Sequence, residues 1–312
     1  MRKIVKLFQF YHLRALILVF RFIYFILYKK INPKGFLLIH IYDYKLRIPL
    51  QYDGIGRALY VYRSRELDHK WMIDNELLPG NVVLDLGANI GYYAIMEAKK
   101  IGSYGKIYAI EPDPRNVELF KNNIKLNNIV DIFDFEQCAI SNENKNAEFV
   151  LSSKTNLSSF DLKKNKDNSN SINVKTYDLG TYLKDKKRVD LIRMDIEGHE
   201  IEVFESLINF SKDFQNHLPK KIIFETHFRV YEKKKEYVRK ILREIFEIGY
   251  EIKYFSSPNE PKEALKKRGY YPFKIIKDCL FHRGIYKNIN QQDFIDFITD
   301  TGGIRTVMLE LK

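Results

Sequence analysis

The sequence predicts an α/β protein whose core is a doubly wound, mostly parallel sheet. From Val82 onward, short apolar runs alternate with segments in which apolar residues recur at helical spacing, and this alternation is typical of parallel sheets covered by helices. The stretch VVLDLGANIGYYA, residues 82–94, shows one such unit: a buried strand meets a glycine loop that opens a helix. Because ligands bind at the carboxyl ends of the strands in such sheets, we expect the functional residues at the strand tips.

Length and composition narrow the class of protein. With 312 residues, 45% of them hydrophobic, the chain can bury a full core, and one large domain with an extension fits better than two equal domains. The two cysteines, Cys138 and Cys279, exclude a disulfide scaffold and a cysteine-rich zinc cluster. They suit a reducing compartment, so we expect a cytoplasmic protein.

The N-terminus carries most of the positive charge. Residues 1–35 hold eight Lys or Arg and no Asp or Glu, which leaves +4 for the other 277 residues, so the body is not a strongly basic nucleic-acid binder. In a helix, Lys3, Lys6, Arg14 and Arg21 fall on one side and most of the remaining surface is apolar. This pattern predicts a basic amphipathic helix that lies peripherally on an anionic membrane, on its inner face.

Three alternatives compete for this segment. The helix could instead pack on the domain or in a dimer, because apolar stripes usually serve packing. A membrane span is disfavoured, since the uninterrupted apolar stretch is shorter than the ~20 residues a span needs. A signal peptide is disfavoured because Arg21 breaks the apolar region and no small-residue cleavage site follows. Asn32 and Pro33 predict that the helix ends near Lys30.

The elements of the body follow from apolar spacing and turn residues. Strands are predicted at 82–86, 106–110, 133–140, 189–194, 221–224 and 250–255, and helices at 91–100, 200–210 and 231–247. The helix at 200–210 places Ile201, Phe204 and Leu207 on one face. The stretch LKKNKDNSNS at 162–171 reads as a polar loop.

The glycine loop after the first strand of this series does not fit two common phosphate sites. A dinucleotide fingerprint needs a second glycine for close approach to a pyrophosphate, and Asn89 stands at that position. A P-loop ends in Gly-Lys-Ser/Thr, whereas this loop continues Gly91-Tyr92-Tyr93. What remains is a tight turn into a helix N-terminus that can accept one carboxylate.

Two acidic residues complete a ligand pattern around this loop. Asp85 at the strand tip would attract an ammonium group, and Glu111 at the next strand tip would accept the two ribose hydroxyls. An amino acid joined to a ribose describes S-adenosylmethionine. The predicted cofactor-binding residues are Asp85, Gly87, Ala88, Asn89, Gly91, Glu111 and Pro112.

Three segments together resemble the FkbM-family methyltransferases: VVLDLGANIGYYA, then IYAIEPDPRNVELFKNNIKLNN at 107–128, then VDLIRMDIEGHEIEVFES at 189–206. The resemblance implies a class I methyltransferase (Rossmann-like) that uses S-adenosylmethionine, generally to methylate hydroxyl oxygen. It also implies a seven-stranded sheet with an antiparallel last strand at 306–311. Arg193 departs from the family, which often has lysine there. The chain then divides into an N-terminal helix (1–35), a cap (36–78) and a methyltransferase domain (79–312) with an insertion at 257–303.

A second group of polar residues follows two further strands. Asp195 and Glu197 come after one strand, and Glu225 and His227 end the next. If these strands are neighbours, Asp195, Glu225 or His227 could act as the general base for an acceptor hydroxyl. Alternatively, Asp195 and Glu225 could hold Mg²⁺, although two carboxylates alone do not establish a metal site.

The predicted function is methyl transfer to a hydroxyl of a sugar, glycan or lipid-linked acceptor. The insertion is expected beside the pocket, where KKRGYYPFK at 266–274 could grip a phosphorylated or glycosylated acceptor or form a solvated flap. One rival is a nucleic-acid methyltransferase, which the modest charge of the body disfavours. A second rival is a catalytically silent membrane-associated scaffold with the same fold.

Overall fold

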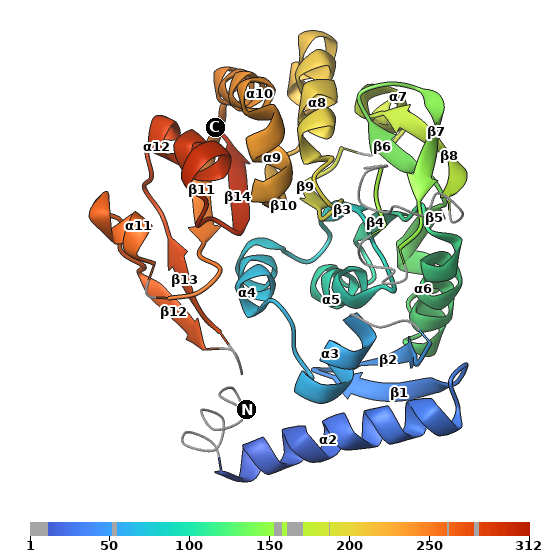
Figure 1. The fold of residues 1–312 in the computed structure, drawn as a ribbon. Coiled ribbons are helices and arrows are strands. Elements are labelled where there is room, and N and C mark those ends of the chain that lie inside the picture. Colours follow the sequence, from blue (N-terminus) through green and yellow to red (C-terminus); the bar gives the residue numbers. More distant parts are fainter. Residues whose placement is uncertain are drawn as a thin grey trace.

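The computed structural model describes residues 12–51, 55–152, 158–160, 171–186, 188–260, 262–277 and 281–312. Its centre is a nine-stranded sheet with the order β12-β13-β11-β14-β10-β9-β3-β4-β5 (Figure 1). The strands of this sheet are β3 (Val82–Leu86), β4 (Lys106–Ile110), β5 (Phe133–Glu136), β9 (Leu191–Met194), β10 (Lys221–Glu225), β11 (Tyr250–Ser256), β12 (Lys274–Lys277), β13 (His282–Tyr286) and β14 (Thr306–Leu311).

The chain direction reverses at the middle of the sheet. β5, β4, β3, β9 and β10 are parallel neighbours, and β14 inserts antiparallel between β10 and β11. Strand order along the chain switches between β3 and β9, which pair from Val83 opposite Leu191 to Leu86 opposite Met194. A crevice forms where connections leave a parallel sheet in opposite directions, so the tips of β3 and β9 are the expected ligand site.

Helices cover both faces of the sheet (Figure 1). α8, α10 and α12 lie on one side, and α4, α5 and α6 on the other. These helices are α4 (Leu67–Glu76), α5 (Tyr92–Ile101), α6 (Pro114–Leu126), α8 (Glu200–Phe214), α10 (Lys235–Glu247) and α12 (Gln291–Asp296). Alternate residues of β3 enter opposite cores, with Leu84 and Leu86 on one side and Val83 on the other. A sheet buried on both faces explains why its strands read as nearly continuous apolar runs.

The N-terminal segment forms an outer layer below α5 and α6 in Figure 1. It contains α2 (His12–Ile31), the antiparallel pair β1 (Phe36–Ile41) and β2 (Tyr44–Pro49), and α3 (Ile55–Tyr62). β2 is fastened to α6 because Asn123 and Asn127 accept hydrogen bonds from the backbone N–H groups of Arg47 and Lys45, at 2.7 and 2.9 Å. Its apolar residues share one core with α4 and α5, so this layer is built into the domain.

A small second sheet has the order β6-β8-β7, formed by β6 (Ala139–Ser141), β7 (Lys145–Val150) and β8 (Ser171–Asp178). The prediction of one strand at 133–140 is therefore wrong, because the chain leaves the main sheet after Glu136 and pairs with β8 from Ala139. Apolar residues such as Cys138 and Ile140 are buried in either arrangement, so their pattern could not reveal the change of sheet. The remaining short elements are α7 (Leu179–Leu183), α9 (Phe228–Tyr231) and α11 (Glu263–Lys267).

Most other predicted elements are confirmed. β3 and β4 have the predicted bounds, β14 is antiparallel as the resemblance implied, and α2 ends at Ile31, one residue beyond the prediction. Two expectations are corrected. The α-helix predicted at 231–247 begins only at Lys235, because Glu232–Lys234 form a 3-10 turn after α9 ends at Tyr231. The sheet has nine strands because β12 and β13, from the insertion, extend it beyond β11. Residues 162–170 of the predicted polar loop lie outside the described residues.

Candidate active site

The loop after β3 lies directly against the tip of β9. Gly87 has a φ of +80°, and a Cβ atom there would overlap the carbonyl oxygen of Asp195. The N–H groups of Gly87 and Ala88 both donate to the carbonyl of Ile110, each at 3.0 Å, which ties the loop to the tip of β4. Gly91 (φ +93°) caps α5 and packs against Phe120, so its glycine serves the turn into the helix.

One pocket opens beside this loop, and we call it the glycine-loop pocket. Its lining comprises Leu86, Gly87, Asn89, Ile110, Glu111, Pro112, Ala139, Ile140, Phe149, Ser158, Phe160, Asp195, Ile196, Glu197 and His199. Polar groups gather at the strand tips, whereas Ile140, Phe149 and Phe160 supply an apolar wall suited to an aromatic ring.

Glu111 is the buried carboxylate of the glycine-loop pocket. Its oxygens accept hydrogen bonds from the backbone N–H groups of Asn89 (2.8 Å) and Asp113 (2.9 Å) and from the Asn116 amide (3.3 Å). Burial raises the pKa of Glu111 to about 7, although these hydrogen bonds oppose the rise. The side chain of Asp113 caps α6 by accepting from the N–H of Arg115 at 3.0 Å, which holds the turn after β4 in place.

A second pocket adjoins the first, and we call it the arginine pocket. Its lining comprises Ile55, Arg65, Gly87, Ala88, Asn89, Tyr92, Tyr93, Arg193, Asp195, Glu197, Glu225, His227 and Arg305. Gly87, Asn89, Asp195 and Glu197 line both pockets. The predicted catalytic residues Asp195, Glu197, Glu225 and His227 therefore all line the arginine pocket. Asp195 and Glu197 belong to the shared wall, and Glu225 and His227 lie beyond it from Glu111.

Asp85 has a different surrounding from the one predicted. Its side chain is fully buried, lines neither pocket, and accepts a hydrogen bond from Arg193 at 2.9 Å. Arg193 also donates to the carbonyl of Gly87 (3.2 Å) and to Asp195 (3.3 Å), and its guanidinium lies 4.3 Å from the centre of the Tyr93 ring. The predicted role of Asp85 as partner of an ammonium group is not supported. Instead, Asp85 positions Arg193, the residue that departs from the family pattern, beneath the loop.

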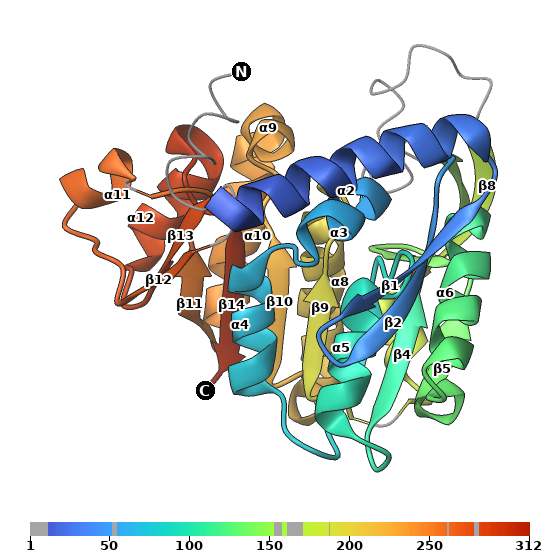
Figure 2. The same cartoon turned by 90° about the horizontal axis from the view of Figure 1, so that it is seen from below.

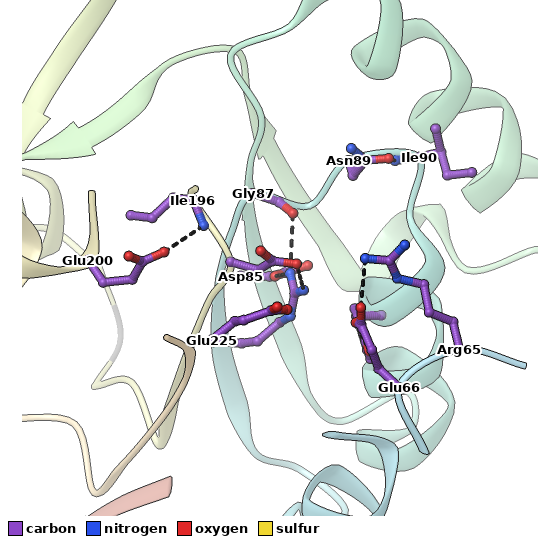
Figure 3. Close-up of polar contacts among 12 residues, drawn as sticks. Arg65, Glu66, Asp85, Gly87, Asn89, Ile90, Ile196, Glu200 and Glu225 are labelled. Carbon is purple, nitrogen blue, oxygen red and sulfur yellow. Dashed lines mark hydrogen bonds and ion pairs between the residues drawn. The ribbon is translucent and has the colours of Figure 1, made fainter. Parts of the chain in front are cut away.

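An ion-pair network forms the opposite wall of the arginine pocket. Arg305 pairs with Glu66 at 2.6 Å and with Glu225 at 3.0 Å, and Arg65 pairs with Glu66 at 2.6 Å. Burial would raise the pKa of Glu66, but Arg65 and Arg305 hold it well below its ordinary value. Figure 3 shows Arg65 and Glu66 on one side of Asp85, Gly87 and Glu225, and Ile196 and Glu200 on the other.

The predicted Mg²⁺ site is not supported. Carboxylate oxygens of Glu66, Asp195 and Glu225 lie within 4.8 Å of one another. However, Arg65 and Arg305 neutralise Glu66 and Glu225, and Arg193 pairs with Asp195. A Mg²⁺ ion needs near-octahedral oxygen ligands, and it would have to displace these guanidinium groups. The donor set does not fit the ion, and no chemical step is assigned to a metal.

His227 stands out among the polar side chains of the arginine pocket. Its Nε2 lies 3.5 Å from Glu200 and 3.8 Å from Asp195, and it has no hydrogen-bond partner among the described residues. Burial lowers the pKa of His227, but the surrounding carboxylates, led by Glu200 and Glu225, outweigh it and raise the pKa above the ordinary value. Burial raises the pKa of Glu225 itself to about 8, against the opposing charge of Arg305.

Glu200 organises the turn after β9. The fully buried carboxylate accepts from the N–H group of Ile196 at 3.0 Å (Figure 3). It also accepts from the N–H group of Gly198 (3.4 Å) and from the Tyr231 hydroxyl (2.6 Å). Gly198 has a φ of +100°, and a Cβ atom there would press into Val230. These contacts give each acidic residue of this turn a separate role. Glu200 holds the backbone of the turn, whereas Asp195 and Glu197 line the two pockets. His199 also lines the glycine-loop pocket, where its side chain contacts Ser141 (2.8 Å) and Phe160.

The sequence reasoning missed Arg65, Glu66 and Arg305. Glu66 and Arg305 are 239 positions apart, and no motif links them. The two tyrosines Tyr92 and Tyr93 could have indicated a contact with another segment, but in the sequence they were used only to exclude a P-loop. In the structure these tyrosines anchor the segment at 65–66, since the Arg65 N–H donates to the Tyr92 hydroxyl (3.1 Å) and the Tyr93 hydroxyl donates to Glu66 (2.6 Å).

The insertion at 257–303 does not line either pocket among the described residues, which corrects the expectation that it lies beside the site. Instead, it forms α11, β12, β13 and α12 at the edge of the main sheet. Phe273, from the stretch KKRGYYPFK, packs against Trp71 and Tyr254 with ring centres 5.9 and 6.0 Å apart. This aromatic contact stabilises the sheet edge.

The sheet order and the paired pockets define a class I methyltransferase fold. Counted along the chain, its seven core strands have the order 3-2-1-4-5-7-6 with an antiparallel seventh strand. The methyltransferase FkbM domain matches residues 85–252, more than half of the chain. The chain belongs to this family of S-adenosylmethionine-dependent methyltransferases.

Individual relatives are distant. The chain is 26% identical over 191 residues to the methyltransferase sdnD of Sordaria araneosa, a match that covers 51% of this chain and 73% of sdnD. The structure of an FkbM methyltransferase from Methylobacillus flagellatus is similar with a TM-score of 0.40 and 13% identity, covering 67% of this chain and 44% of that protein. TYW2 of M. jannaschii in complex with AdoMet has a TM-score of 0.40 and 14% identity, covering 89% of this chain and 88% of TYW2.

Proposed function

We propose that this protein transfers a methyl group from S-adenosylmethionine to a hydroxyl oxygen of a sugar, glycan or lipid-linked acceptor. The observation that carries the proposal is the shared wall between the two pockets. Gly87, Asn89, Asp195 and Glu197 separate a pocket that ends in Glu111 from a pocket that contains His227. Two ligands bound on either side of this wall would meet at Asp195, which is the arrangement that group transfer requires.

The glycine-loop pocket fits the cofactor by its donor and acceptor groups. Glu111 would accept hydrogen bonds from the ribose hydroxyls, and the apolar wall with Ile140, Phe149 and Phe160 would hold the adenine. Gly87 would bring the backbone close to the methionine part of the cofactor. When bound, S-adenosylmethionine supplies a sulfonium-linked methyl group, which the acceptor oxygen takes up as that oxygen loses its proton.

His227 is the residue best placed to take this proton. Asp195 and Glu225 already pair with arginines, whereas Nε2 of His227 has no hydrogen-bond partner among the described residues. The neighbouring carboxylates of Asp195 and Glu200 would stabilise the imidazolium that forms as the proton arrives, as a buried carboxylate does in other acid–base sites. Asp195 would orient the acceptor hydroxyl from the shared wall.

The charged lining of the arginine pocket supports a polyhydroxylated acceptor. Arg65 and Arg305 present N–H donors, and Glu197 and Glu225 present acceptors. Hydroxyl groups both donate and accept, so a sugar can satisfy such a lining where an apolar molecule would leave these groups unpaired. The same reasoning favours hydroxyl oxygen over carbon as the atom that receives the methyl group.

Comparative mass spectrometry tests this proposal. Glycans and lipids from cells that lack the protein would be compared with those from cells complemented by the wild type or by the His227→Gln variant. We expect a species that lacks the mass of one methyl group in deletion and variant cells, and fragmentation that places the methyl on oxygen. Methylation of nucleic acid instead, or cofactor binding without any changed species, would contradict the proposal and favour one of its two rivals.

A further inference from the structure

The outer face of α2 is apolar, the reverse of an ordinary surface helix. Eight of the nineteen large apolar side chains that are exposed among the described residues belong to this helix. They are Leu16, Ile17, Phe20, Phe22, Ile23, Tyr24, Leu27 and Ile31. Phe20 is 69% exposed and Leu27 54%, and no described helix or strand covers this face (Figure 2). A concentration of exposed apolar side chains on one element marks an interaction surface.

Contacts with α3 fix which side of α2 faces outward. Phe25 is fully buried, with its ring centre 5.8 Å from that of Tyr60. Arg21 points inward and donates to the carbonyl of Val61 at 3.2 Å. The predicted basic stripe is thus corrected at Arg21, which faces the protein, while the Lys3, Lys6 and Arg14 side chains lie outside the described set. The free side of the helix is its apolar side.

The charge around this face selects its partner. The first acidic residue of the chain is Asp43, and the preceding 42 residues carry eight Lys or Arg. Lys30 and Lys34 are exposed at the C-terminal end of α2. A second copy docked face to face would bring two such basic segments together and repel, whereas an anionic lipid surface would attract them. An apolar face with exposed lysines at one end, on a helix that runs along the outside of the domain, matches an interfacial membrane helix.

We propose that the outer face of α2 docks flat onto an anionic lipid bilayer. Its apolar side chains would enter the boundary between headgroups and acyl chains, and Lys30 and Lys34 would contact anionic headgroups. Among the described residues, no helix is long and apolar enough to cross a bilayer. The docking mode proposed for α2 is insertion of one helix face, and it does not depend on methyl transfer.

Docking would also place the arginine pocket near the lipid surface. α3 contacts α2 through Tyr60 and Val61, and it lines the arginine pocket through Ile55. A single helix therefore separates the docking face from the acceptor side of the site. This consequence rests on the proposed function: it narrows the acceptor to a hydroxyl presented at a membrane surface, such as a lipid-linked sugar.

Vesicle co-sedimentation of the full chain tests the docking. The wild type should pellet with vesicles of phosphatidylcholine and phosphatidylglycerol, less with phosphatidylcholine alone, and less at high salt. The Phe20→Ser/Leu27→Ser variant should bind more weakly by about tenfold per removed side chain. The matched control is Leu78→Ser/Tyr104→Ser, which removes one aliphatic and one aromatic side chain that are even more exposed than Leu27 and Phe20 and should bind like the wild type. The Lys30→Glu/Lys34→Glu variant should lose preference for anionic vesicles.

Several outcomes would overturn the proposal. Wild-type protein that stays in the supernatant, or pelleting that Phe20→Ser/Leu27→Ser leaves unchanged, would exclude the face as a lipid site. Equal pelleting with neutral and anionic vesicles would exclude the charge selection. A dimer seen by light scattering that only Phe20→Ser/Leu27→Ser dissociates would assign the face to a second copy. Calorimetry with S-adenosylmethionine on the same preparations separates these results from the proposed function, because the cofactor pocket contains no α2 residue.

Discussion

The two pockets share a wall but are assembled in different ways. The glycine-loop pocket is built mainly from strand tips and the turns that follow them, with backbone groups of Gly87 and Asn89 beside a single buried carboxylate, Glu111. The arginine pocket is built from side chains of distant segments, in which Arg65, Glu66, Glu225 and Arg305 neutralise one another. The first is arranged by local backbone geometry, and the second by long-range electrostatics.

This difference predicts different kinds of failure. A pocket made from backbone and one carboxylate should lose cofactor affinity when its side chain changes, with little effect on folding. A pocket held by paired charges should lose stability when one charge is removed, because the partner is left buried and unpaired. Variants confined to one pocket can therefore separate binding, chemistry and folding.

The largest expected effect is on turnover, from His227→Gln in the arginine pocket. Loss of the proton acceptor should lower methyl transfer about 10²–10⁴-fold. Cofactor affinity should stay unchanged, because His227 does not line the glycine-loop pocket. Labelled-methyl transfer to an extract from deletion cells and calorimetry with the cofactor measure the two quantities. His217→Gln, at an exposed histidine, is the control. If the His227→Gln variant kept full turnover, His227 would not be the general base, and Asp195 or Glu225 would be the remaining candidates.

Gly87→Ala should damage both pockets at once. A Cβ atom would overlap the Asp195 carbonyl oxygen, so the tips of β3 and β9 must separate. We expect a loss of about 3 kcal/mol or more in the free energy of unfolding, together with loss of cofactor binding. Gly80→Ala is the matched control, since Gly80 has the same φ, +81°, but open space around it, and it should cost only about 1 kcal/mol. Equal losses in urea unfolding would show that φ, and not the close approach, limits this loop.

Arg305→Met tests the ion-pair network through stability. It removes the partner that Glu66 and Glu225 share and should lower the free energy of unfolding by about 3 kcal/mol. Arg268→Met removes an exposed arginine paired with Asp293 and Asp296, and should cost no more than about 1 kcal/mol. Denaturant titration of both variants gives the comparison. A similar small loss in each would mean that the network adds little to stability.

Glu111→Gln should weaken the cofactor without affecting the fold. A hydrogen bond to a charged group contributes about 1.5–3 kcal/mol, so affinity should fall roughly 10–100-fold. Glu118→Gln, on the exposed side of α6, should bind as the wild type does. Calorimetry supplies both affinities, and thermal unfolding confirms that the fold is kept. Unchanged affinity in Glu111→Gln would remove Glu111 from the cofactor site.

The smallest expected effect is a pH dependence of cofactor affinity. Burial raises the pKa of Glu111 to about 7, so the charged form that best accepts the ribose hydroxyls prevails above this pH and is lost below it. Affinity should fall as pH decreases from 7 to 5.5, by at most about tenfold per pH unit. The Glu111→Gln variant should show a flatter profile over the same range. If cofactor affinity depended on pH in the same way in the wild type and in Glu111→Gln, a group other than Glu111 would be responsible for the titration.

Local patterns in the sequence were sufficient for the parallel core and for the positions of the candidate site residues. The bounds of β3 and β4 were predicted because short apolar runs end at Asp85-Leu86-Gly87 and at Glu111-Pro112. Asp195, Glu197, Glu225 and His227 were expected together because parallel strands end at the same edge, and the structure places them in one pocket. Their predicted chemical roles await the measurements above.

Local sequence patterns did not predict the contacts of a residue that could bind either of two different partners. Asp85 at a strand tip suits either a ligand ammonium or a buried arginine, and only the pairing of β3 with β9 brings Arg193 to it. The 257–303 insertion contains strands, and whether they cover the site or extend the sheet depends on which edge is free. That edge is β11, far from the shared wall.

The sequence by itself determined the family, the class I core and the glycine-loop turn, because these depend on interactions between residues close together along the chain. Tertiary structure alone decided the arginine pocket and the outward face of α2. Arg305 reaches Glu66 across 239 positions, and α2 exposes its apolar side because Phe25 and Arg21 are held by α3. Both features depend on which distant groups pair with a buried charge or cover an apolar surface. The spacing of residues along the chain does not directly specify these distant partners.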